Sequence, residues 1–559
     1  MTTCKQCKTS FEITDADRAF YKKRGVPEPT LCPQCRHQRR LAIRNERTFY
    51  PGTCASCKKS IISYFHPEKP HKVYCPECWY SDTWDAFEHG RDFDFSQPFF
   101  PQFKELYEQV PTLSLDVVNC KDSQFVSYCG DDKRCYLDIA GEANQDCYYC
   151  KFTKYSVQCV DCSFVYNSEL NYECVNCHRV YGCRYTDRCL DSNNLSFCYD
   201  CRGCQDCFGC WNLRNKKYHI FNKAYTPEEY KQKIVDYNLN SYAAVELLKK
   251  EMGERITKEA LVCFAQLVNS EDCTGDDLNN CKSVHESFDV TKAENSKWLC
   301  DVLDAKECYD LDFSLYKPEA SVELISTLNM TYSAFCCASH YCNNTWYSDK
   351  CNNSSDLFGC IGLNKKSYSI FNKQYSKEDY AVLRERIVAH MKKTGEWGEF
   401  FPIGTSGFGY NETVAQEYFL LNEDECKKNG WAWWDKTPFT KGKETLKATG
   451  ISDMIQDVPE TLVKEILACV DCGRNYKVIA QELAFYKKIG VPVPRQCTEC
   501  RHHARNKRAG ERVLHHRQCM CSLAGHDHTG RCPHEFETTY APERPEKVFC
   551  EQCYQKEIL

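Results

Sequence analysis

Residues 197–210 read FCYDCRGCQDCFGC, in which a cysteine recurs at every third position: Cys198, Cys201, Cys204, Cys207 and Cys210. The spacing continues upstream, because all sixteen cysteines from Cys120 to Cys210 occupy positions divisible by three. Helices repeat about every 3.6 residues and flat strands every two, so neither explains this register. A narrow β-solenoid does, if each short edge points one small side chain at the axis and coils stack about 4.8 Å apart.

The other residues of this register are also small or short, such as Val126, Gly141, Thr153 and Ser156. Cysteine would then fill a slim core as a compact apolar side chain. A metallothionein-like thiolate cluster is the competing interpretation, favoured by the dense run at 198–210. Because valine, glycine and serine cannot replace a thiolate ligand, packing explains the whole column and metal only part of it. A polyproline-like bundle also repeats every three residues, but the stretch lacks the glycine or proline that it needs.

A second stretch repeats the pattern from Cys281 to Ser314 and, after a break near Lys317-Pro318, from Cys336 to Cys360. Both stretches end alike, since FGCWNLRNKKYHIFNKAYTPEEY from position 208 and FGCIGLNKKSYSIFNKQYSKEDY from position 358 match at an offset of 150 residues. Each ending runs into a capping sequence. We therefore expect helices over about 227–262 and 377–395, which would cover the open ends of two solenoids.

The two ends of the chain carry paired CxxC motifs and are copies of each other. AFYKKRGVPEPTLCPQCRHQRR near the N-terminus faces AFYKKIGVPVPRQCTECRHHAR near the C-terminus. The distance of 28 residues from Cys4 to Cys32 recurs between Cys469 and Cys497, as expected of an internal duplication. The cysteines form four predicted sets: Cys4, Cys7, Cys32 and Cys35; Cys54, Cys57, Cys75 and Cys78; Cys469, Cys472, Cys497 and Cys500; and Cys519, Cys532, Cys550 and Cys553.

Two CxxC turns together supply four thiolates, which is the tetrahedral Cys4 set of closed structural zinc sites. A lone cysteine is more often a buried small hydrophobe and a lone CxxC a redox pair, but repeated double pairs disfavour both. We therefore predict about four Zn²⁺ ions per chain. The fourth set departs from its partner, because MCSLAGHDHTGR separates Cys519 from Cys532. Cys521, His526 or His528 could replace Cys519 as the ligand.

The knuckle Cys32-Pro33-Gln34-Cys35 runs into RHQRRLAIRNER, which predicts a helix that carries ligands in its first turn. With its double CxxC, this region resembles a zinc-binding, treble-clef-like domain found across bacteria. The whole layout is similar to Cys-rich bacterial zinc-ribbon proteins that carry such a domain at each end. The resemblance implies the fold of the two ends and their metal, and it implies no activity.

Basic residues follow the first finger at each end of the chain. On a helix, residues 36, 40, 44 and 47 would share one face. Zinc-ribbon folds often bind nucleic acid, so the stripe is a candidate phosphate-contacting surface. A solvated face or salt bridges to nearby acids explain it equally well. The candidate nucleic-acid contacts are Arg36, Arg40, Arg44, Arg47, Arg501, Arg505, Arg508 and Arg512.

A non-catalytic zinc-binding scaffold or interaction protein is the function that we predict first, because repeat architectures offer extended surfaces to partners. The alternatives are zinc-dependent binding of RNA or DNA, and a thiol redox or metal-storage role. Paired acid and base groups, a GxSxG elbow, a Gly-rich phosphate loop and an HExxH helix are absent from the sequence in any credible context. The sequence therefore predicts neither an enzyme nor a small-molecule substrate.

The expected partners are proteins or nucleic acid, and no membrane, because no run of residues is long and apolar enough for a span. A net charge of −6 confines any nucleic-acid surface to a local patch. The 44 cysteines and the lack of an apolar N-terminal region favour a reducing cytoplasm.

The predicted fold is mainly β and multidomain, with two narrow cysteine-lined β-solenoids and helical caps between treble-clef or zinc-ribbon-like finger pairs. In chain order we expect a finger pair (1–90), a linker (91–117), the first solenoid and cap (118–225), a helical segment (226–262), the second solenoid and cap (263–375), a helix with an extended connector (376–460) and a second finger pair (461–559).

Overall fold

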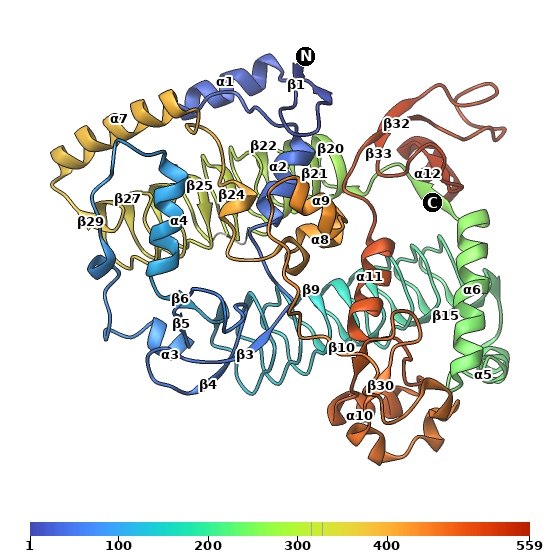
Figure 1. The fold of residues 1–559 in the computed structure, drawn as a ribbon. Helices are drawn as coiled ribbons and strands as arrows, with labels where there is room; N and C mark the ends of the chain where they lie inside the picture. The colour runs from blue at the N-terminus through green and yellow to red at the C-terminus, as the bar shows by residue number, and fades with distance from the viewer. Residues whose placement is uncertain (315, 327, 559) are drawn as a thin grey trace. The chain divides into compact units, whose positions relative to one another are not determined.

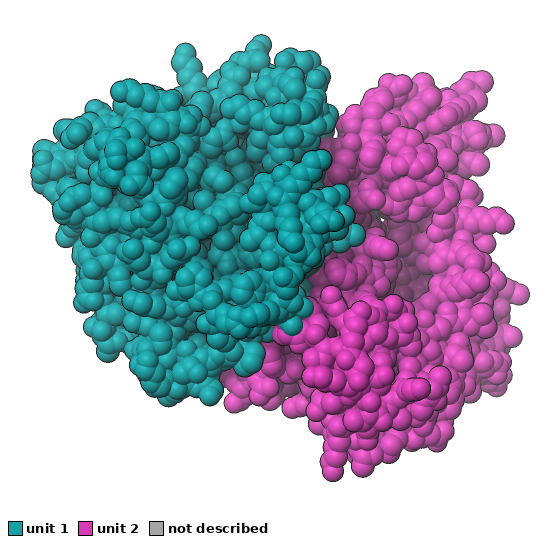
Figure 2. Space-filling model, viewed as in Figure 1, with its two compact units in different colours: residues 1–115, 265–437 teal, residues 116–264, 438–559 magenta. Residues whose placement is uncertain are grey.

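The computed structural model describes residues 1–314, 316–326 and 328–558, and the chain divides into two compact units (Figure 2). Unit 1 combines Met1–Leu115 with Ala265–Thr437, and unit 2 combines Asp116–Phe264 with Pro438–Leu559. Each unit thus joins segments that are far apart in the sequence. The N-terminal finger pair belongs with the second cysteine-rich stretch, and the C-terminal pair belongs with the first. Most of the regular structure is strand, arranged in many small sheets.

Residues 117–224 of unit 2 form a stack of short parallel strands and bridges, which we call the first ladder (Figure 1). Paired residues lie twelve positions apart, as Lys121 with Lys133 and Lys133 with Gln145. One coil of the chain therefore takes four steps of three residues. The strands are β7 (Val117–Val118), β8 (Cys129–Gly130), β9 (Lys151–Lys154), β10 (Val157–Val160), β11 (Ser163–Tyr166), β12 (Glu169–Tyr172), β13 (Val175–His178), β14 (Asn193–Ser196), β15 (Gln205–Phe208), β16 (Lys217–Ile220) and the antiparallel β17 (Lys223–Ala224).

The three-residue step has a backbone cause. The residue before a column position adopts the left-handed conformation, as at Phe125 (φ 54°), Phe164 (φ 56°) and Gly209 (φ 59°), and this turns the chain at each corner. The next side chain then points into the stack, where Cys147 and Cys150 are 0% exposed. The column of cysteines predicted from the sequence therefore lies in the interior of the ladder.

The described residues of 267–374 in unit 1 form the second ladder. Most of its pairs lie twelve positions apart, as Ser355 with Ser367, but those at its start lie eleven apart, as Glu271 with Lys282. One coil holds an extra residue, because Lys306 pairs with Glu319, thirteen positions later. This coil explains the break and change of register that the sequence shows near Pro318. The strands are β19 (Leu267–Val268), β20 (Glu271–Asn279), β21 (Lys282–Thr291), β22 (Glu294–Lys297), β23 (Cys300–Leu303), β24 (Val322–Ile325), β25 (Ala334–Cys337), β26 (Asn343–Trp346), β27 (Ser355–Phe358), β28 (Ser367–Ile370) and the antiparallel β29 (Lys373–Gln374).

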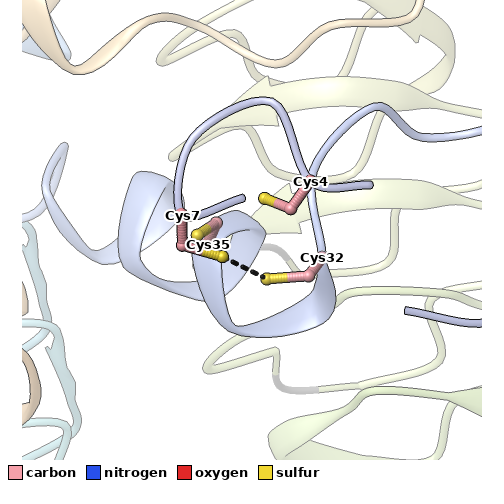
Figure 3. Close-up of side chains that lie close together, drawn as sticks. All are labelled: Cys4, Cys7, Cys32 and Cys35. Carbon is pink, nitrogen blue, oxygen red and sulfur yellow. Dashed lines mark hydrogen bonds between the residues drawn. The ribbon is translucent and has the colours of Figure 1, made fainter. Parts of the chain in front are cut away.

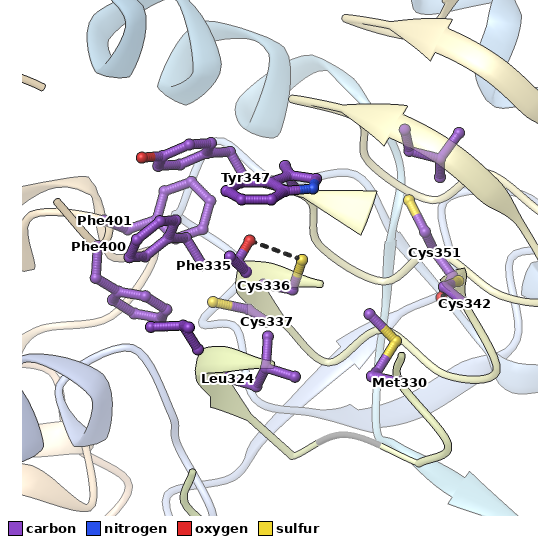
Figure 4. Close-up of a cluster of buried hydrophobic side chains, with 14 of the residues drawn as sticks. Leu324, Met330, Phe335, Cys336, Cys337, Cys342, Tyr347, Cys351, Phe400 and Phe401 are labelled. Carbon is purple, nitrogen blue, oxygen red and sulfur yellow. Dashed lines mark hydrogen bonds between the residues drawn. The ribbon is translucent and has the colours of Figure 1, made fainter. Parts of the chain in front are cut away.

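The interior of the second ladder and a group of aromatic rings beside it form one hydrophobic core (Figure 4). Cys336 and Cys351 are fully buried column residues. Next to them the rings of Phe335 and Tyr347 stack with their centroids 4.8 Å apart, and Phe401 meets Tyr347 edge-on at 6.2 Å. The ladder of unit 1 is thus packed on its inside by small side chains and against its neighbours by rings.

Helices follow both ladders where the capping sequences predict them. A capping box at Thr226 begins α5 (Pro227–Asp236), which packs against β16, and Ser376 caps α7 (Lys377–Thr394), which packs against β28. The helical segment expected over 226–262 is divided into two helices. The chain turns at Asn238 (φ 44°), and Ser241 begins a separate helix, α6 (Tyr242–Glu259).

The residues expected to be a linker, 91–117, instead contain α4 (Phe99–Gln109) and β6 (Thr112–Leu113). Phe99, Phe103 and Leu106 repeat at helical spacing and are buried in the core of unit 1, which explains why this segment is ordered. The finger pair of unit 1 consists of β1 (Thr2–Thr3), β2 (Ser10–Phe11), α1 (Asp15–Arg24), α2 (Pro33–Leu41), β3 (Tyr50–Thr53), β4 (Ser60–Ser63), β5 (Val73–Tyr74), α3 (Pro76–Trp79) and η1 (Ala86–His89).

The connector after α7 is divided between the units at Thr437. In unit 1 it forms η2 (Ile403–Thr405), η3 (Tyr410–Glu412), α8 (Ala415–Tyr418) and α9 (Glu423–Lys428), and in unit 2 η4 (Ala448–Gly450), η5 (Ile455–Asp457) and η6 (Glu460–Lys464). The C-terminal finger pair consists of β30 (Leu467–Ala468), β31 (Asn475–Tyr476), α10 (Ala480–Ile489), α11 (Thr498–Ala509), β32 (His515–Gln518), β33 (Glu535–Thr538), β34 (Lys547–Phe549) and α12 (Glu551–Ile558). β18 (Leu261–Cys263) pairs in parallel with β34. Among the described helices, none combines the length and apolar character that crossing a membrane requires.

Candidate metal centres

The first predicted set of cysteines converges on one point (Figure 3). Cys4 and Cys7 lie in the turn between β1 and β2, and Cys32 and Cys35 lie at the start of α2. All four sulfurs are within 4.8 Å of one another, and the sulfurs of Cys7 and Cys32 are 3.7 Å apart. A tetrahedron with zinc–sulfur bonds of about 2.3 Å has edges of about 3.8 Å. The set therefore has the size of a zinc site.

The other three predicted sets converge in the same way, each within 4.8 Å. All sixteen predicted ligand cysteines are thus brought into four tetrads. One sulfur–sulfur distance in each further tetrad also matches a tetrahedral edge: 3.8 Å for Cys57 and Cys75, 3.6 Å for Cys472 and Cys497, and 4.0 Å for Cys532 and Cys550.

The first CxxC of three tetrads is a tight turn that ends in a left-handed residue. Lys8 (φ 65°), Lys58 (φ 64°) and Gly473 (φ 72°) each follow the second cysteine of the motif directly. In the first of these turns, the Lys8 N–H donates to the Cys4 carbonyl at 3.1 Å. This closure brings both thiols of the motif to the same side of the turn, as binding to one metal ion requires.

The second CxxC straddles the beginning of a helix. Cys32 is the N-cap of α2, and Cys497 is the N-cap of α11. Free N–H groups and the positive end of the helix dipole favour a thiolate at such a position. Backbone N–H groups also act on the first CxxC of the second tetrad. Burial raises the pKa of the Cys54 thiol, but hydrogen bonds from the backbone N–H groups of Cys75 and Cys57 outweigh burial and lower this pKa to about 6.

In the fourth tetrad, Cys519 occupies the place that Cys54 has in the N-terminal copy. The Cys550 N–H donates to Cys519 Sγ at 3.2 Å, just as the Cys75 N–H donates to Cys54 Sγ at 3.3 Å. Cys519 therefore completes this tetrad, in which Cys521, His526 and His528 do not take its place. Cys521, His526 and His528 instead form a separate group with Cys553, whose four donor atoms also lie within 4.8 Å of one another. The sequence located these residues but did not indicate a second group.

The arginines that follow the first knuckle of unit 1 face the second ladder. Arg36 Nε donates to Asp310 Oδ2 at 2.9 Å, and Arg40 Nε donates to Asp312. Arg36 is 0% exposed and Arg40 is 1% exposed. Burial raises the pKa of Asp312, but the charge of Arg40 outweighs burial and holds this pKa below its usual value. Helix α2 is therefore tied to the ladder by buried ion pairs.

Helix α11 makes the same kind of contact with the first ladder of unit 2. Arg505 Nη1 donates to Asp161 Oδ1 at 2.6 Å, and Arg501 Nη1 lies 2.7 Å from Asp161 Oδ2. Arg508 Nε donates to Asp187 Oδ2 at 3.0 Å. Both finger pairs thus place a basic helix against the acidic groups of the ladder in their own unit.

The expected stripe of four arginines along one helix is wrong at two positions. α2 ends at Leu41, so Arg44 and Arg47 lie beyond it. There the side-chain oxygen of Asn45 accepts hydrogen bonds from the N–H groups of Arg47 and Thr48, which turns the chain away from a helix.

Six of the eight candidate nucleic-acid contacts are buried, namely Arg36, Arg40, Arg44, Arg47, Arg501 and Arg505. They are not accessible to a phosphate backbone in this structure. Arg508 and Arg512 are partly exposed. Arg508 already binds Asp187. The structure therefore contains salt bridges to nearby acids, which are the alternative to nucleic-acid contacts that we named from the sequence.

The thiols inside the ladders are hydrogen-bond donors. Cys150 Sγ donates to the carbonyls of Tyr148 and Cys159, each at 3.4 Å. Ser156 Oγ donates to the Lys154 carbonyl at 2.9 Å, so serine plays the same part at another inward position of the ladder. Burial raises the pKa of the Cys189 thiol well above its usual value. Thiols that donate to backbone carbonyls favour packing over metal binding at these positions, because a metal ligand is the thiolate.

Residues 1–44 match the family model described as "Probable treble clef domain", so the chain begins with a treble-clef zinc finger. This agrees with the resemblance seen in the sequence at that end. No curated protein matches the chain significantly. One solved structure, described as a "putative acetyltransferase from Desulfovibrio desulfuricans G20", aligns over 47% of this chain and 71% of its own at 12% identity. Its TM-score of 0.10 is too low to carry a structural argument.

Proposed function

We propose that the protein is a non-catalytic scaffold in which each unit is a narrow β-solenoid braced by its own pair of zinc fingers. One Zn²⁺ in each tetrad gives about four ions per chain from these sites. The observation that carries the proposal is the burial of Arg36, Arg40, Arg501 and Arg505 against their own unit, with ladder carboxylates as partners. Fingers that bind a ladder of the same chain act as clamps, and four cysteine ligands fill the coordination of zinc.

The solenoid interpretation is supported by the regular ladder geometry. Most successive coils pair in parallel at twelve-residue intervals, and one side chain per three-residue step points inward. A stack of this kind has open ends that invite further strands. The packing of α5 on β16 and of α7 on β28 supports a capping role for these helices. The two braced ladders would give partners a stiff, extended surface.

Exposed tyrosines support protein partners for this surface. Tyr155 and Tyr181 on the first ladder are 50% and 46% exposed, and Tyr332 and Tyr341 on the second are 56% and 51% exposed. Tyrosine is enriched in protein interfaces, because it buries a large area at a low cost in side-chain entropy.

We infer a reducing compartment, the cytoplasm, because the described cysteines are all free of disulfides.

Cross-linking of the full-length chain in cell extract, with and without nuclease, tests this function. A scaffold should retain its protein partners after nuclease treatment and at raised salt. The double variant Tyr155→Ala, Tyr181→Ala should lose partners, whereas Tyr80→Ala, an equally exposed tyrosine outside the ladders at 49%, should keep them. Equal partner sets for both variants would count against the ladder surface.

Nucleic-acid binding is separated from the scaffold role by its salt dependence. Phosphate contacts release counterions, so the affinity of such a protein falls steeply as salt rises. Purified full-length chain should show no such affinity for RNA or DNA of random sequence. Tight binding with a steep salt slope, together with loss of every partner after nuclease treatment, would overturn the scaffold proposal.

A further inference from the structure

The loop that interrupts the fourth tetrad brings a second set of metal-binding side chains against it. Cys521 Sγ lies 3.6 Å from His526 Nδ1, and Cys553 Sγ lies 3.5 Å from His528 Nε2. All four donor atoms are within 4.8 Å of one another. With zinc–sulfur bonds of about 2.3 Å and zinc–nitrogen bonds of about 2.0–2.1 Å, a tetrahedral site has sulfur–nitrogen edges of about 3.5–3.6 Å. Both measured distances match such edges.

Each of the two imidazoles has an acceptor on the nitrogen that points away from this set. His526 Nε2 lies 2.9 Å from Glu557 Oε1, and His528 Nδ1 lies 2.9 Å from the carbonyl oxygen of Gly530. A metal-bound histidine almost always donates its other N–H to a carboxylate or a carbonyl, which fixes the tautomer and the orientation of the ring. Both rings are therefore held with the correct nitrogen free to bind a cation.

We propose that the last finger holds two zinc ions joined by the thiolate of Cys553. The first ion occupies the tetrad of Cys519, Cys532, Cys550 and Cys553. The second is bound by Cys521, His526, His528 and Cys553. The chain then carries five ions rather than four, and the insertion between Cys519 and Cys532 is itself a metal-binding loop.

Charge supports sharing of the thiolate. One Zn²⁺ with four thiolates carries a net charge of −2, whereas two Zn²⁺ with five thiolates and two neutral imidazoles carry −1. The second ion therefore reduces the negative charge around Cys519, Cys550 and Cys553, which are buried. It also fastens residues 522–531, a stretch of turns in which exposed residues predominate and which has few side chains of its own to pack.

Native mass spectrometry of the reduced, zinc-saturated full-length chain counts the ions directly. We expect five Zn²⁺ for the natural chain and four for Cys521→Ser and for His526→Gln. His526→Cys supplies a replacement ligand and should retain five. His503→Gln, on the exposed side of α11, is the matched control and should also retain five. Four ions in the natural chain would overturn the proposal, as would five in the Cys521→Ser variant.

The shared thiolate gives a second readout that needs no variant. In the chain loaded with ¹¹³Cd, two of the cadmium resonances should be split by scalar coupling to each other through Cys553 Sγ. The same coupling should vanish in Cys521→Ser, where only one ion is left in this finger. Five ions without any cadmium–cadmium coupling would show two separate sites and would contradict the bridge. This readout also decides the case if a variant fails to fold.

Discussion

Arg505 Nη1 lies 2.6 Å from Asp161 Oδ1 inside unit 2, and neither side chain is more than 1% exposed. Arg40 stands at the equivalent place in unit 1, since both arginines come five residues after the last cysteine of their tetrad. Arg40 in turn binds Asp312 of the second ladder. The duplicated fingers thus use the same buried contact to hold two different ladders.

Removal of the carboxylate from this contact should destabilise unit 2 strongly. The Asp161→Asn variant removes this carboxylate from the buried Arg505, whereas Arg501 keeps its ion pair with Glu482 at 3.3 Å. Breaking a buried pair in this way costs about 3–5 kcal/mol. Urea denaturation followed by hydrogen exchange in the first ladder measures the loss. Asp191→Asn is the matched control, because Asp191 pairs with Arg179 at the surface, where the side chains are 55% and 57% exposed. That change should cost less than about 1 kcal/mol, and similar losses for the two variants would contradict the clamp.

Cysteines of the tetrads and of the ladders should respond differently to the same substitution. Cys35→Ser should remove one zinc ion per chain, because serine is a poor replacement for a thiolate ligand. Cys150→Ser should leave the zinc content unchanged, since Ser156 at another inward position of the same ladder donates a hydrogen bond to the carbonyl two residues before it, as Cys150 does. Metal analysis with thiol counting distinguishes the two. Loss of metal from Cys150→Ser would show that the ladder thiols bind metal.

Asp132 should make the stability of unit 2 depend on pH. Its Oδ1 accepts a hydrogen bond from the Asn144 N–H, and burial raises its pKa to about 6. The unfolded chain has an ordinary aspartate pKa of about 3.9, so between about pH 4 and pH 6 the folded state binds more protons than the unfolded state. Stability from this group is therefore present at low pH and is lost as the pH rises through 6, by about 2–3 kcal/mol in all.

The Asp132→Asn variant tests this sign. The amide cannot ionise, so the stability of the variant relative to the natural chain should increase from pH 4 to pH 7. Denaturation of both proteins with zinc in excess at each pH measures the difference between their free energies of unfolding. Protonation of the metal ligands affects both proteins alike and cancels in this difference. Asp131→Asn, at an exposed neighbouring position, should follow the natural chain. A constant difference across the range would refute the assignment.

Deletion of residues 1–115 should loosen the second ladder and spare the first. Unit 1 loses the fingers that neutralise Asp310 and Asp312, whereas unit 2 keeps all its segments. Hydrogen exchange should accelerate over residues 267–374 and stay slow over 117–224. Deletion of residues 438–559 should give the reverse pattern. If the chain without residues 1–115 instead exchanges faster over residues 117–224, the division into these two units is contradicted.

The local features of this fold could be predicted from the sequence because each depends on neighbours in the chain. A CxxC turn followed by a helix start sets the tetrads at Cys32 and Cys497, whatever the rest of the chain does. The cysteine column follows from a backbone turn at every third residue, which leaves its register in the sequence.

The assignment of fingers to ladders could not be predicted, because it depends on contacts between distant residues. From the sequence alone, Arg36 is expected to be a surface cation. The structure shows that its Nε lies 2.9 Å from Asp310 Oδ2. The helix break at Asn238 and the burial of α4 depend likewise on tertiary packing. In the last finger, the sequence offered Cys521 as a substitute ligand, since nothing along the chain shows that Cys553 meets two sets of donors at once.

The distribution of each unit over distant segments has a consequence for how the protein is made. Arg36 leaves the ribosome 274 residues before Asp310, and Asp161 leaves it 344 residues before Arg505. Every segment of unit 1 has been synthesised once Thr437 is added, whereas unit 2 also needs the segment that begins at Pro438. The nascent first ladder therefore stays without the arginines of its clamp while the second ladder and the connector are synthesised, and unit 2 is completed after unit 1.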